Sequence, residues 1–252
     1  MTHRAGVIGK DISYSLSPRI HKLFSQASGI NLDYEIHDID KDPIPFIYDF
    51  FKKGGTGLNI TKPYKEIVAK EFSTSLDSVN CLYGEIDATS TDGSGFIADI
   101  KSKNISLNDS NILLFGLGGA GKSILKEIKT TKNIYVENRT KAKVETVVQK
   151  NENIRKYSGE PVDLFISCTE KFDLESITFI QNINFAPNSS IYDVNYKNET
   201  NIVLAEMANI DESRTYDGLG MLVEQAADSF EHWFEHRPET ENIKKILLSE
   251  WL

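Results

Sequence analysis

Residues 112–121, ILLFGLGGAG, are the stretch of sequence that decides the fold. The first four residues predict a buried strand, and the glycine-rich run after them leads directly into a helical pattern. Gly116 lets the chain reverse tightly, Gly118 lets the backbone approach a pyrophosphate, and Gly121 lets the helix pack closely on the strand. Because N–H groups at a helix N-terminus attract anions, this turn predicts a phosphate-binding site.

A second strand is predicted at residues 133–137, which completes the strand–helix–strand unit of a dinucleotide-binding domain. Two residues near its end favour different cofactors. Glu137 stands 21 residues after Gly116, about the spacing at which a carboxylate binds the 2′-hydroxyl of NAD. Arg139 would instead pair with the 2′-phosphate of NADP, because its planar guanidinium matches phosphate oxygens.

The residues after Arg139 favour NADP as the cofactor. Thr140 adds a hydroxyl, and Lys141 and Lys143 add positive charge beside the expected phosphate. The alternative is that Arg139 and its neighbours are only the solvated start of a helix.

Composition limits the classes of protein to consider. The 252 residues suffice for two modest domains or one large one, and 40% hydrophobic with 26% charged residues is ordinary for a globular protein. No segment is long enough to span a membrane, and the apolar run at residues 5–8 is too short for a signal peptide, so we expect a cytoplasmic protein. Cys81 and Cys168 stand far apart, which favours free thiols. A net charge of −9 argues against nucleic acid or an anionic membrane as partner and leaves a small molecule.

Strands and helices alternate in the first half of the chain, which predicts a mainly parallel sheet. The first helix has the clearest pattern, because Ser17 can cap it and Pro18 suits its first turn. A helix at residues 95–101 is expected to link two domains. The other expected strands are residues 4–9, 33–39, 57–61 and 79–86, and the other expected helices are residues 18–28, 45–53 and 63–72.

The second half continues the α/β pattern after the glycine-rich turn. Residues 163–167 and 190–194 predict further buried strands, and the stretch between them, from 170 to 187, is poorly patterned. Residues 218–250 predict helices with an apolar face that includes Ser229. No internal repeat or flexible linker is found.

Polar side chains gather where the predicted strands of the first half end, which is where open α/β sheets bind ligands. They lie at residues 15–18, 59–65 and 91–92. Taken singly, each has a structural interpretation: Ser17 and Asp92 can cap helices, and Lys65 can lie on a solvated face. Together they form a recognisable set.

This set resembles the shikimate dehydrogenase family. Residues 15–21, SLSPRIH, match its Ser-x-Ser-Pro-x-Ile-His signature, and residues 59–65, NITKPYK, match its lysine motif. Further matches follow in the family's order: Val79-Asn80, residues 91–96, the glycine-rich turn, Asn138-Arg139-Thr140, residues 193–196 with Thr200, and residues 217–227.

The resemblance implies an oxidoreductase that reduces 3-dehydroshikimate to shikimate with hydride from NADPH, in the shikimate pathway of aromatic amino acid biosynthesis. Hydride arriving at a carbonyl carbon leaves negative charge on the oxygen, so a proton donor is needed nearby. Lys65 and Asp92 match the family's catalytic pair. The implied substrate-binding residues are Ser15, Ser17, Thr61, Asn80, Gln225 and Tyr196. The implied cofactor-binding residues are Gly116, Gly118, Gly119, Ala120, Gly121, Asn138, Arg139, Thr140, Lys143, Gly218 and Met221, and no metal is expected.

We therefore expect an α/β protein of two domains. An N-terminal substrate-binding and catalytic domain at residues 1–96 is rejoined by C-terminal helices at residues 221–252, and a doubly wound Rossmann-type NADP-binding domain occupies residues 97–220. The active site is expected in the cleft between them, closing around both ligands to exclude water.

Some positions depart from the family's usual pattern. Tyr14, Cys81, Ser90 and Asn198 stand where histidine, threonine, asparagine and proline are common. None removes a proposed catalytic group, but Cys81 and Ser90 flank expected substrate contacts. A quinate/shikimate dehydrogenase that uses NAD and a low-activity dinucleotide-binding paralogue therefore stay open, as do a monomer and a homodimer.

Residues 232–236, HWFEH, fit the zinc-protease pattern HxxEH, in which histidines four apart share one helix face. A catalytic zinc needs a third ligand, and nothing nearby in the sequence supplies one. We interpret this segment as part of an amphipathic terminal helix.

Overall fold

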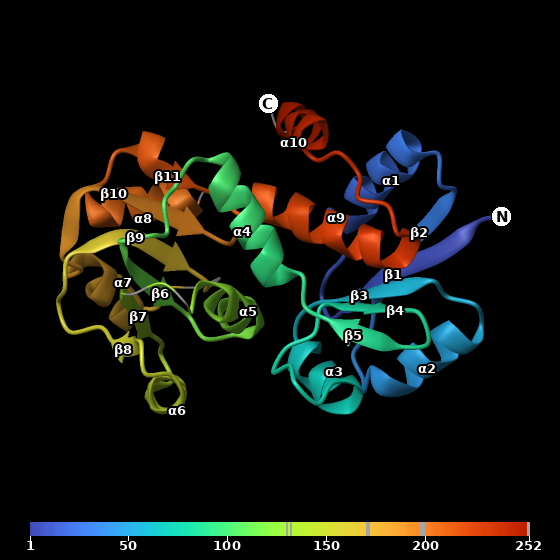
Figure 1. Ribbon diagram of the computed structural model, residues 1–252, viewed down its shortest axis with the longest axis horizontal. Coiled ribbons are helices and arrows are strands. Elements are labelled where there is room, and N and C mark those ends of the chain that lie inside the picture. Colours follow the sequence, from blue (N-terminus) through green and yellow to red (C-terminus); the bar gives the residue numbers. More distant parts are fainter. Residues whose placement is uncertain (130, 132, 170–171, 197–199, 251–252) are drawn as a thin grey trace. The chain divides into compact units, whose positions relative to one another are not determined.

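The chain forms two compact units in the computed structural model, which describes residues 1–129, 131, 133–169, 172–196 and 200–250 (Figure 1). Unit 1 comprises Met1–Phe96 and Leu222–Leu252, and unit 2 comprises Ile97–Met221. Over the described ranges, no helix is both long and apolar enough to cross a membrane.

Unit 1 is built on a five-stranded sheet in the order β2-β1-β3-β4-β5. The expected parallel pairing holds for β1 with β2 and with β3, whereas β4 is antiparallel to both β3 and β5. The prediction of a single strand at residues 79–86 is wrong, because the chain turns between β4 and β5. In this turn Gly84 and Ile86 have φ angles of 57° and 75°. The strands are β1 (His3–Gly9), β2 (Leu32–Asp38), β3 (Gly57–Ile60), β4 (Cys81–Tyr83) and β5 (Asp87–Thr89).

Helices cover both faces of this sheet, with α2 and α3 on one side and α1 and α9 on the other (Figure 1). Side chains alternate along β3, so Leu58 and Ile60 enter the apolar core with Ile47 of α2 and Val68 of α3. The residue between them, Asn59, faces the opposite way and meets α9. The helices that lie wholly in unit 1 are α1 (Ser17–Ser28), α2 (Ile44–Lys52), α3 (Lys65–Phe72) and α10 (Glu241–Ser249), whereas α4 (Asp92–Ser102) and α9 (Leu219–Phe234) each have residues in both units.

The start of α1 differs from the sequence prediction. Ser17 does not cap α1: the N-cap position is Leu16, no side chain caps it, and Ser17 is the first helical residue. The helices predicted at residues 218–250 are α9 and α10, and the chain leaves α9 after Phe234, where Glu235 has a φ of 53°. Trp233 fastens the end of α9 to the sheet through a 3.1 Å hydrogen bond from its indole N–H to the Leu82 carbonyl.

Unit 2 is a doubly wound parallel sheet in the order β11-β10-β9-β6-β7-β8, which confirms the predicted fold class. β6 lies between β7 and β9, so the connections that leave β6 and β9 run to opposite sides; such a switch point is where α/β sheets bind ligands. The elements are β6 (Asn111–Phe115), α5 (Gly119–Ile128), β7 (Asn133–Glu137), α6 (Lys141–Lys150), β8 (Ile154–Lys156), β9 (Val162–Ser167), α7 (Leu174–Gln181), β10 (Phe185–Asp193), α8 (Thr200–Ala208), a short 3₁₀ turn (Glu212–Arg214) and β11 (Thr215–Tyr216).

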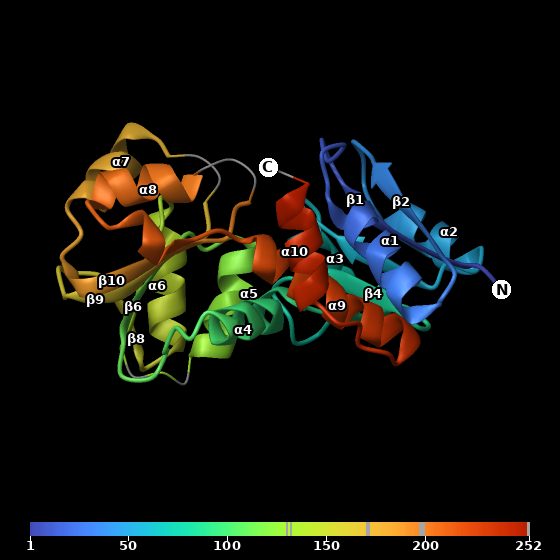
Figure 2. The same ribbon diagram turned by 90° about the horizontal axis from the view of Figure 1, so that it is seen from above.

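The poorly patterned stretch from 170 to 187 holds regular structure that the sequence did not predict. α7 lies there beside α8 (Figure 2). Its start carries one readable signal, since Asp173 is the N-cap and accepts a 2.9 Å hydrogen bond from the Ser176 N–H. The short edge strand β11 pairs with β10 over only two residues, too few for a periodic pattern.

Candidate active site

Lys65 and Asp92 form an ion pair inside unit 1. The Lys65 Nζ lies 2.6 Å from the Asp92 Oδ2, and the two side chains are 18% and 7% exposed. Lys65 is the first residue of α3 and Asp92 the first of α4, so two helix starts bring the groups together. The alternative interpretation, that Lys65 lies on a solvated helix face, is therefore wrong.

Asn80 holds the other oxygen of this carboxylate. Its amide nitrogen donates to the Asp92 Oδ1 at 2.9 Å, and it also lies 2.9 Å from the Thr91 Oγ1 and 3.1 Å from the Gln225 Oε1. The Thr91 N–H donates to the Asn80 Oδ1 at 2.7 Å, which fixes the orientation of the amide because a backbone N–H requires an acceptor. The Asn80 amide has two hydrogens for these three acceptors, so Asp92 shares them with Thr91 and Gln225.

A second layer of polar residues lies behind Asn80. It joins Asn59, a member of the predicted cluster at residues 59–65, to Ser229, to which the sequence assigned no role in the site. The Asn59 amide donates to the Ser229 Oγ at 2.8 Å and to the Asn80 carbonyl at 3.2 Å. The Ser229 hydroxyl in turn donates to the Gln225 carbonyl at 3.0 Å. The available signal was a serine on the otherwise apolar face of α9.

Aromatic rings pack against this polar layer. His21 is fully buried, stacked on Tyr34 at 4.2 Å between ring centroids and 5.0 Å from Trp233. The Tyr34 hydroxyl donates to the Asn59 Oδ1 at 2.8 Å. Burial lowers the pKa of His21 to about 3, because it disfavours the charged form of the ring. His21 is therefore a neutral ring at physiological pH.

The other predicted substrate residues of unit 1 lie at the start of α1, directly after β3 and on α9. The Ser17 N–H donates to the Ser15 Oγ at 3.3 Å at the start of α1. Thr61 follows β3 directly, and its backbone N–H bonds the Ile8 carbonyl at 2.9 Å. Gln225 is tied to α9 by a 2.8 Å hydrogen bond from its amide to the Leu222 carbonyl.

Three departures from the family pattern lie in unit 1 as well: Cys81, Tyr14 and Ser90, which directly follows β5 and is partly buried. Cys81 is buried, and this burial raises the pKa of its thiol to about 12 against the effect of hydrogen bonds with Ser229 and Trp233. Its side chain therefore stays protonated and packs as an apolar group. Tyr14 is 58% exposed, with the Lys62 ammonium 5.7 Å from its ring centroid.

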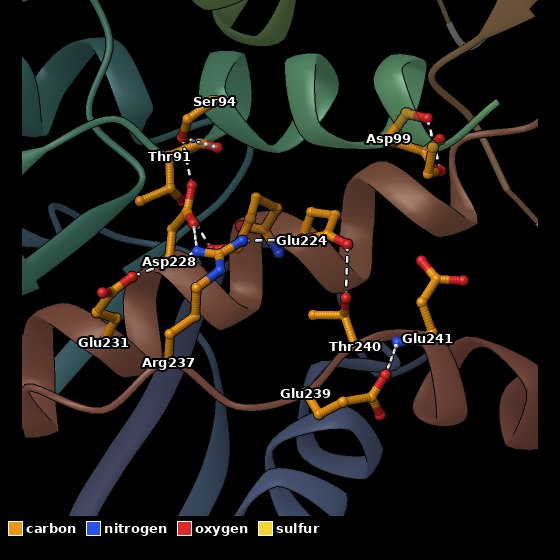
Figure 3. Close-up of polar contacts among 12 residues, drawn as sticks. Thr91, Ser94, Asp99, Glu224, Asp228, Glu231, Arg237, Glu239, Thr240 and Glu241 are labelled. Atoms are coloured by element: carbon orange, nitrogen blue, oxygen red, sulfur yellow. Dashed lines mark hydrogen bonds and ion pairs between the residues drawn. The ribbon is translucent and has the colours of Figure 1, made fainter. Parts of the chain in front are cut away.

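An ionic network fixes the helix that carries Gln225 and Ser229 (Figure 3). Arg237 follows α9 and pairs with three carboxylates of that helix: Glu224 at 2.8 Å, Glu231 at 3.4 Å, and Asp228. Asp228 also accepts a hydrogen bond from Ser94 of α4. The network thus ties α9 to the helix that begins with Asp92.

In unit 2, the glycine-rich turn has the close approach that its sequence predicts. Gly116 has a φ of 106°, a conformation that L side chains rarely adopt. A Cβ on Gly121 would lie 2.0 Å from the Gly116 carbonyl oxygen, so only glycine lets α5 begin this close to β6. Space is open around Gly118, where a Cβ would meet no atom within 4 Å. Gly119, Ala120 and Gly121 form the first turn of α5, whose N–H groups have no partner within the helix.

Asn138 joins this turn to the start of α6. Its Oδ1 accepts a 2.9 Å hydrogen bond from the Leu117 N–H, and its amide donates to the Thr140 carbonyl at 3.1 Å. Lys143 reaches the Leu117 carbonyl at 3.4 Å. The expected cofactor residues of both segments are thereby brought together at the ends of β6 and β7.

The two residues that favoured different cofactors have different surroundings. The Glu137 carboxylate is 6% exposed and pairs with the Lys141 ammonium at 2.8 Å. Arg139 is 78% exposed and lies 3.9 Å from the Asp173 carboxylate, a weak surface pair. Arg139 is therefore free to turn to a ligand, whereas Glu137 is held.

Three further predicted residues belong to unit 2, and one position is not described. Gly218 is packed against the residue that follows β10, where a Cβ would lie 2.0 Å from the Val194 carbonyl oxygen. Met221 is 6% exposed, and Tyr196 is partly buried after β10. Asn198 lies outside the described residues.

The structure does not support a zinc site at residues 232–236, HWFEH, because such a site needs both histidines on one helix face. α9 ends at Phe234, so His236 does not share a helix with His232. His232 stacks on Tyr83 at 4.7 Å between centroids. The part of the chain that the structure describes contains no cluster of three or more His, Cys, Asp or Glu side chains suited to a metal ion.

Two family profiles match the chain. One, described as the shikimate dehydrogenase substrate binding domain, matches residues 7–91, and one described as the shikimate 5′-dehydrogenase C-terminal domain matches residues 218–248. A curated relative from Legionella pneumophila strain Corby, named shikimate dehydrogenase (NADP(+)), is 34% identical over 99% of this chain and 100% of its own length.

Solved structures share the fold at lower identity. Shikimate 5-dehydrogenase from Thermus thermophilus, in complex with NADP(H) and shikimate, superimposes with a TM-score of 0.83 at 22% identity, covering 99% of this chain and 100% of that one. Quinate dehydrogenase from Corynebacterium glutamicum, in complex with NAD, gives a TM-score of 0.83 at 20% identity, covering 98% and 99%.

Proposed function

The chain belongs to the shikimate dehydrogenase family, and on this premise we propose that it reduces 3-dehydroshikimate to shikimate with NADPH, in aromatic amino acid biosynthesis. The observation that carries the proposal is the 2.6 Å contact between Lys65 and Asp92, two largely buried groups at neighbouring helix starts. An ammonium and a carboxylate in contact form a unit that can exchange a proton with a substrate oxygen.

The reaction adds a hydride to the carbonyl carbon and a proton to its oxygen. NADPH supplies the hydride when it is bound. The Lys65 ammonium stabilises the negative charge that develops on the oxygen and hands over a proton, within a pair whose geometry Asn80 fixes through the Asp92 Oδ1. Asp92 keeps Lys65 in place between turnovers.

The substrate is a polyhydroxylated acid, and the polar residues of unit 1 suit its groups. The hydroxyls of Ser15 and Ser17 would bind the carboxylate, while Thr61, Asn80 and Gln225 would bond the ring hydroxyls. Tyr196, from unit 2, would add a further contact. A site that bonds each hydroxyl rejects an analogue lacking one, because its own polar groups are then left unpaired.

The residues of unit 2 fit a dinucleotide phosphate. The open space at Gly118 and the first turn of α5 would hold the pyrophosphate, and Asn138, Arg139, Thr140 and Lys143 would bind the adenosine end. Arg139 is exposed and only weakly paired, as a residue that receives a 2′-phosphate must be. Gly218 and Met221 would contact the nicotinamide end.

Substitution of the ion pair tests the proposal. Lys65→Ala and Asp92→Asn should each lower kcat roughly a hundred- to ten-thousand-fold, the range of a lost proton-transfer group. NADPH affinity, measured by fluorescence titration, should stay close to that of the wild type, because the cofactor residues lie in unit 2. Turnover is measured as NADPH oxidation in the presence of 3-dehydroshikimate.

Lys70→Ala is the matched control, since Lys70 is exposed on the last turn of the same helix. It should leave turnover and binding unchanged. Loss of cofactor binding in proportion to turnover in the Lys65 and Asp92 variants would show that the pair is structural and would contradict the proposal.

One observation favours a second candidate, a quinate/shikimate dehydrogenase that uses NAD. Glu137 stands at the end of β7, where a carboxylate binds the ribose of NAD. Assays with both cofactors on shikimate and on quinate separate the two candidates. Preference for NAD with quinate would favour the second.

A further inference from the structure

Glu137 presents a conflict for an enzyme that binds NADP. Its carboxylate is 6% exposed at the end of β7, directly before the segment that would bind the adenosine end. A negative charge at this point attracts the 2′-hydroxyl of NAD and repels the 2′-phosphate of NADP. Glutamate is nonetheless the residue present.

Two contacts hold this carboxylate in place. The Glu137 Oε1 accepts a 2.7 Å hydrogen bond from the Asn138 N–H and lies 2.8 Å from the Lys141 ammonium. Lys141 is half exposed and also lies 3.9 Å from Glu175 of α7, a contact too long to compete with the first. The charge of Glu137 is thus matched by one nearby cation.

The stability of α6 does not explain why a lysine stands at position 141. Lys141 is the first residue of this helix, where the partial positive charge of the N-terminus disfavours a cation. The first turn of α6 contains no acidic residue to offset it. The pairing with Glu137 accounts for a lysine at a place where helix energetics alone would select against one.

We propose that Lys141 is a specificity-determining residue that masks the charge of Glu137 and so allows the site to accept the 2′-phosphate of NADP. Lys141 acts through Glu137, whereas Arg139 meets the ligand itself. The inference rests on the proposed use of NADP by this site. It explains how the site can bind the 2′-phosphate of NADP although Glu137 is present.

A double-mutant cycle on binding tests the proposal without relying on turnover. The variants are Lys141→Gln, Glu137→Gln and the two combined, and the probes are adenosine 2′,5′-bisphosphate and 5′-AMP, titrated by calorimetry. Lys141→Gln uncovers the carboxylate and should weaken the bisphosphate roughly tenfold, with little effect on AMP. Adding Glu137→Gln removes the exposed charge and should restore bisphosphate binding to nearly the wild-type value.

Two matched variants complete the set. Lys150→Gln removes the same charge from the other end of the ten-residue α6 and should leave both affinities unchanged. Lys141→Arg keeps the pair and should bind as the wild type does. If Lys141→Gln fails to fold, the single variant Glu137→Gln still tests the proposal. Its affinity for the bisphosphate should equal or exceed that of the wild type, and a weaker affinity would contradict the proposal.

The outcomes that overturn the proposal are distinct. A double variant as weak as Lys141→Gln would mean that Lys141 contacts the phosphate directly. Equal affinity of Lys141→Gln and wild type for the bisphosphate would mean that the pair does not affect discrimination. Failure of the proposed reaction appears instead as absent turnover with 3-dehydroshikimate while the binding cycle keeps its pattern.

Discussion

At the scale of single residues, the neutral imidazole of His21 links the stability of the protein to pH. The pKa of His21 falls from 6.5 to about 3 on folding, because burial disfavours its charged form. The unfolded chain therefore binds more protons than the folded one between these values, so stability is complete above pH 6.5 and is lost as the pH falls. The loss from this group is about 1.4 kcal/mol per pH unit.

His21→Phe removes this titration and keeps an aromatic ring beside Tyr34 and Trp233. The free energy of unfolding, measured in urea between pH 6.5 and pH 4, should therefore fall less steeply with decreasing pH in the variant, by roughly 1.4 kcal/mol per unit. Parallel curves for variant and wild type would show that His21 is charged in the folded protein.

At the scale of elements, α10 is held to α9 by a buried carboxylate. The Glu224 Oε1 lies 2.7 Å from the Thr240 Oγ1 and 2.8 Å from the Lys244 Nζ, with the two charged side chains 8% and 10% exposed. Burial alone would raise the pKa of Glu224, but its hydrogen bonds with Lys244 and Thr240 lower it overall. The pair thus stabilises the fold above the ordinary glutamate pKa of 4.5 and loses this effect as the pH falls.

Lys244→Met should cost about 1.5–3 kcal/mol of unfolding free energy at neutral pH, because it removes one hydrogen bond from a buried charge that keeps its other partners. The cost should shrink below pH 4.5, where Glu224 takes up a proton in the variant. Lys245→Met, at the exposed neighbouring position, is the control and should change little. A constant cost at every pH would contradict the role of the charge.

The elements also show what sequence alone can and cannot predict. The strands at residues 112–115 and 133–137 were predictable, because buried parallel strands are continuous apolar runs. The turn between β4 and β5 was not, since it places Ile86, a β-branched residue, at a positive φ. The Lys65 and Asp92 pair followed from motifs, but the contact of Asn59 with Ser229 joins residues 170 apart and requires the tertiary fold.

At the scale of the whole molecule, the two units differ in chain continuity. Unit 2 is one uninterrupted segment, whereas unit 1 needs residues from both ends of the sequence. A fragment of residues 97–221 should therefore fold alone and bind NADP, as measured by circular dichroism and calorimetry. Residues 1–96 alone should stay unfolded, because they lack Phe230 and Trp233; losing either large aromatic costs about 3–5 kcal/mol against a total stability of about 5–15 kcal/mol.

Adding a peptide of residues 222–250 to the 1–96 fragment is the complementary experiment. Recovery of native circular dichroism would support the discontinuous unit, and a stably folded 1–96 fragment without the peptide would contradict it.

This discontinuity has a consequence for synthesis on the ribosome. Chains usually acquire structure in the order in which they are made, from the N-terminus onward. Here the sheet face that Trp233 covers stays bare until the helix carrying Trp233 has been made, although the middle segment can already be complete. The nascent protein thus carries an unfinished apolar surface while residues 97–221 are being made, and that interval is when chaperones would engage it.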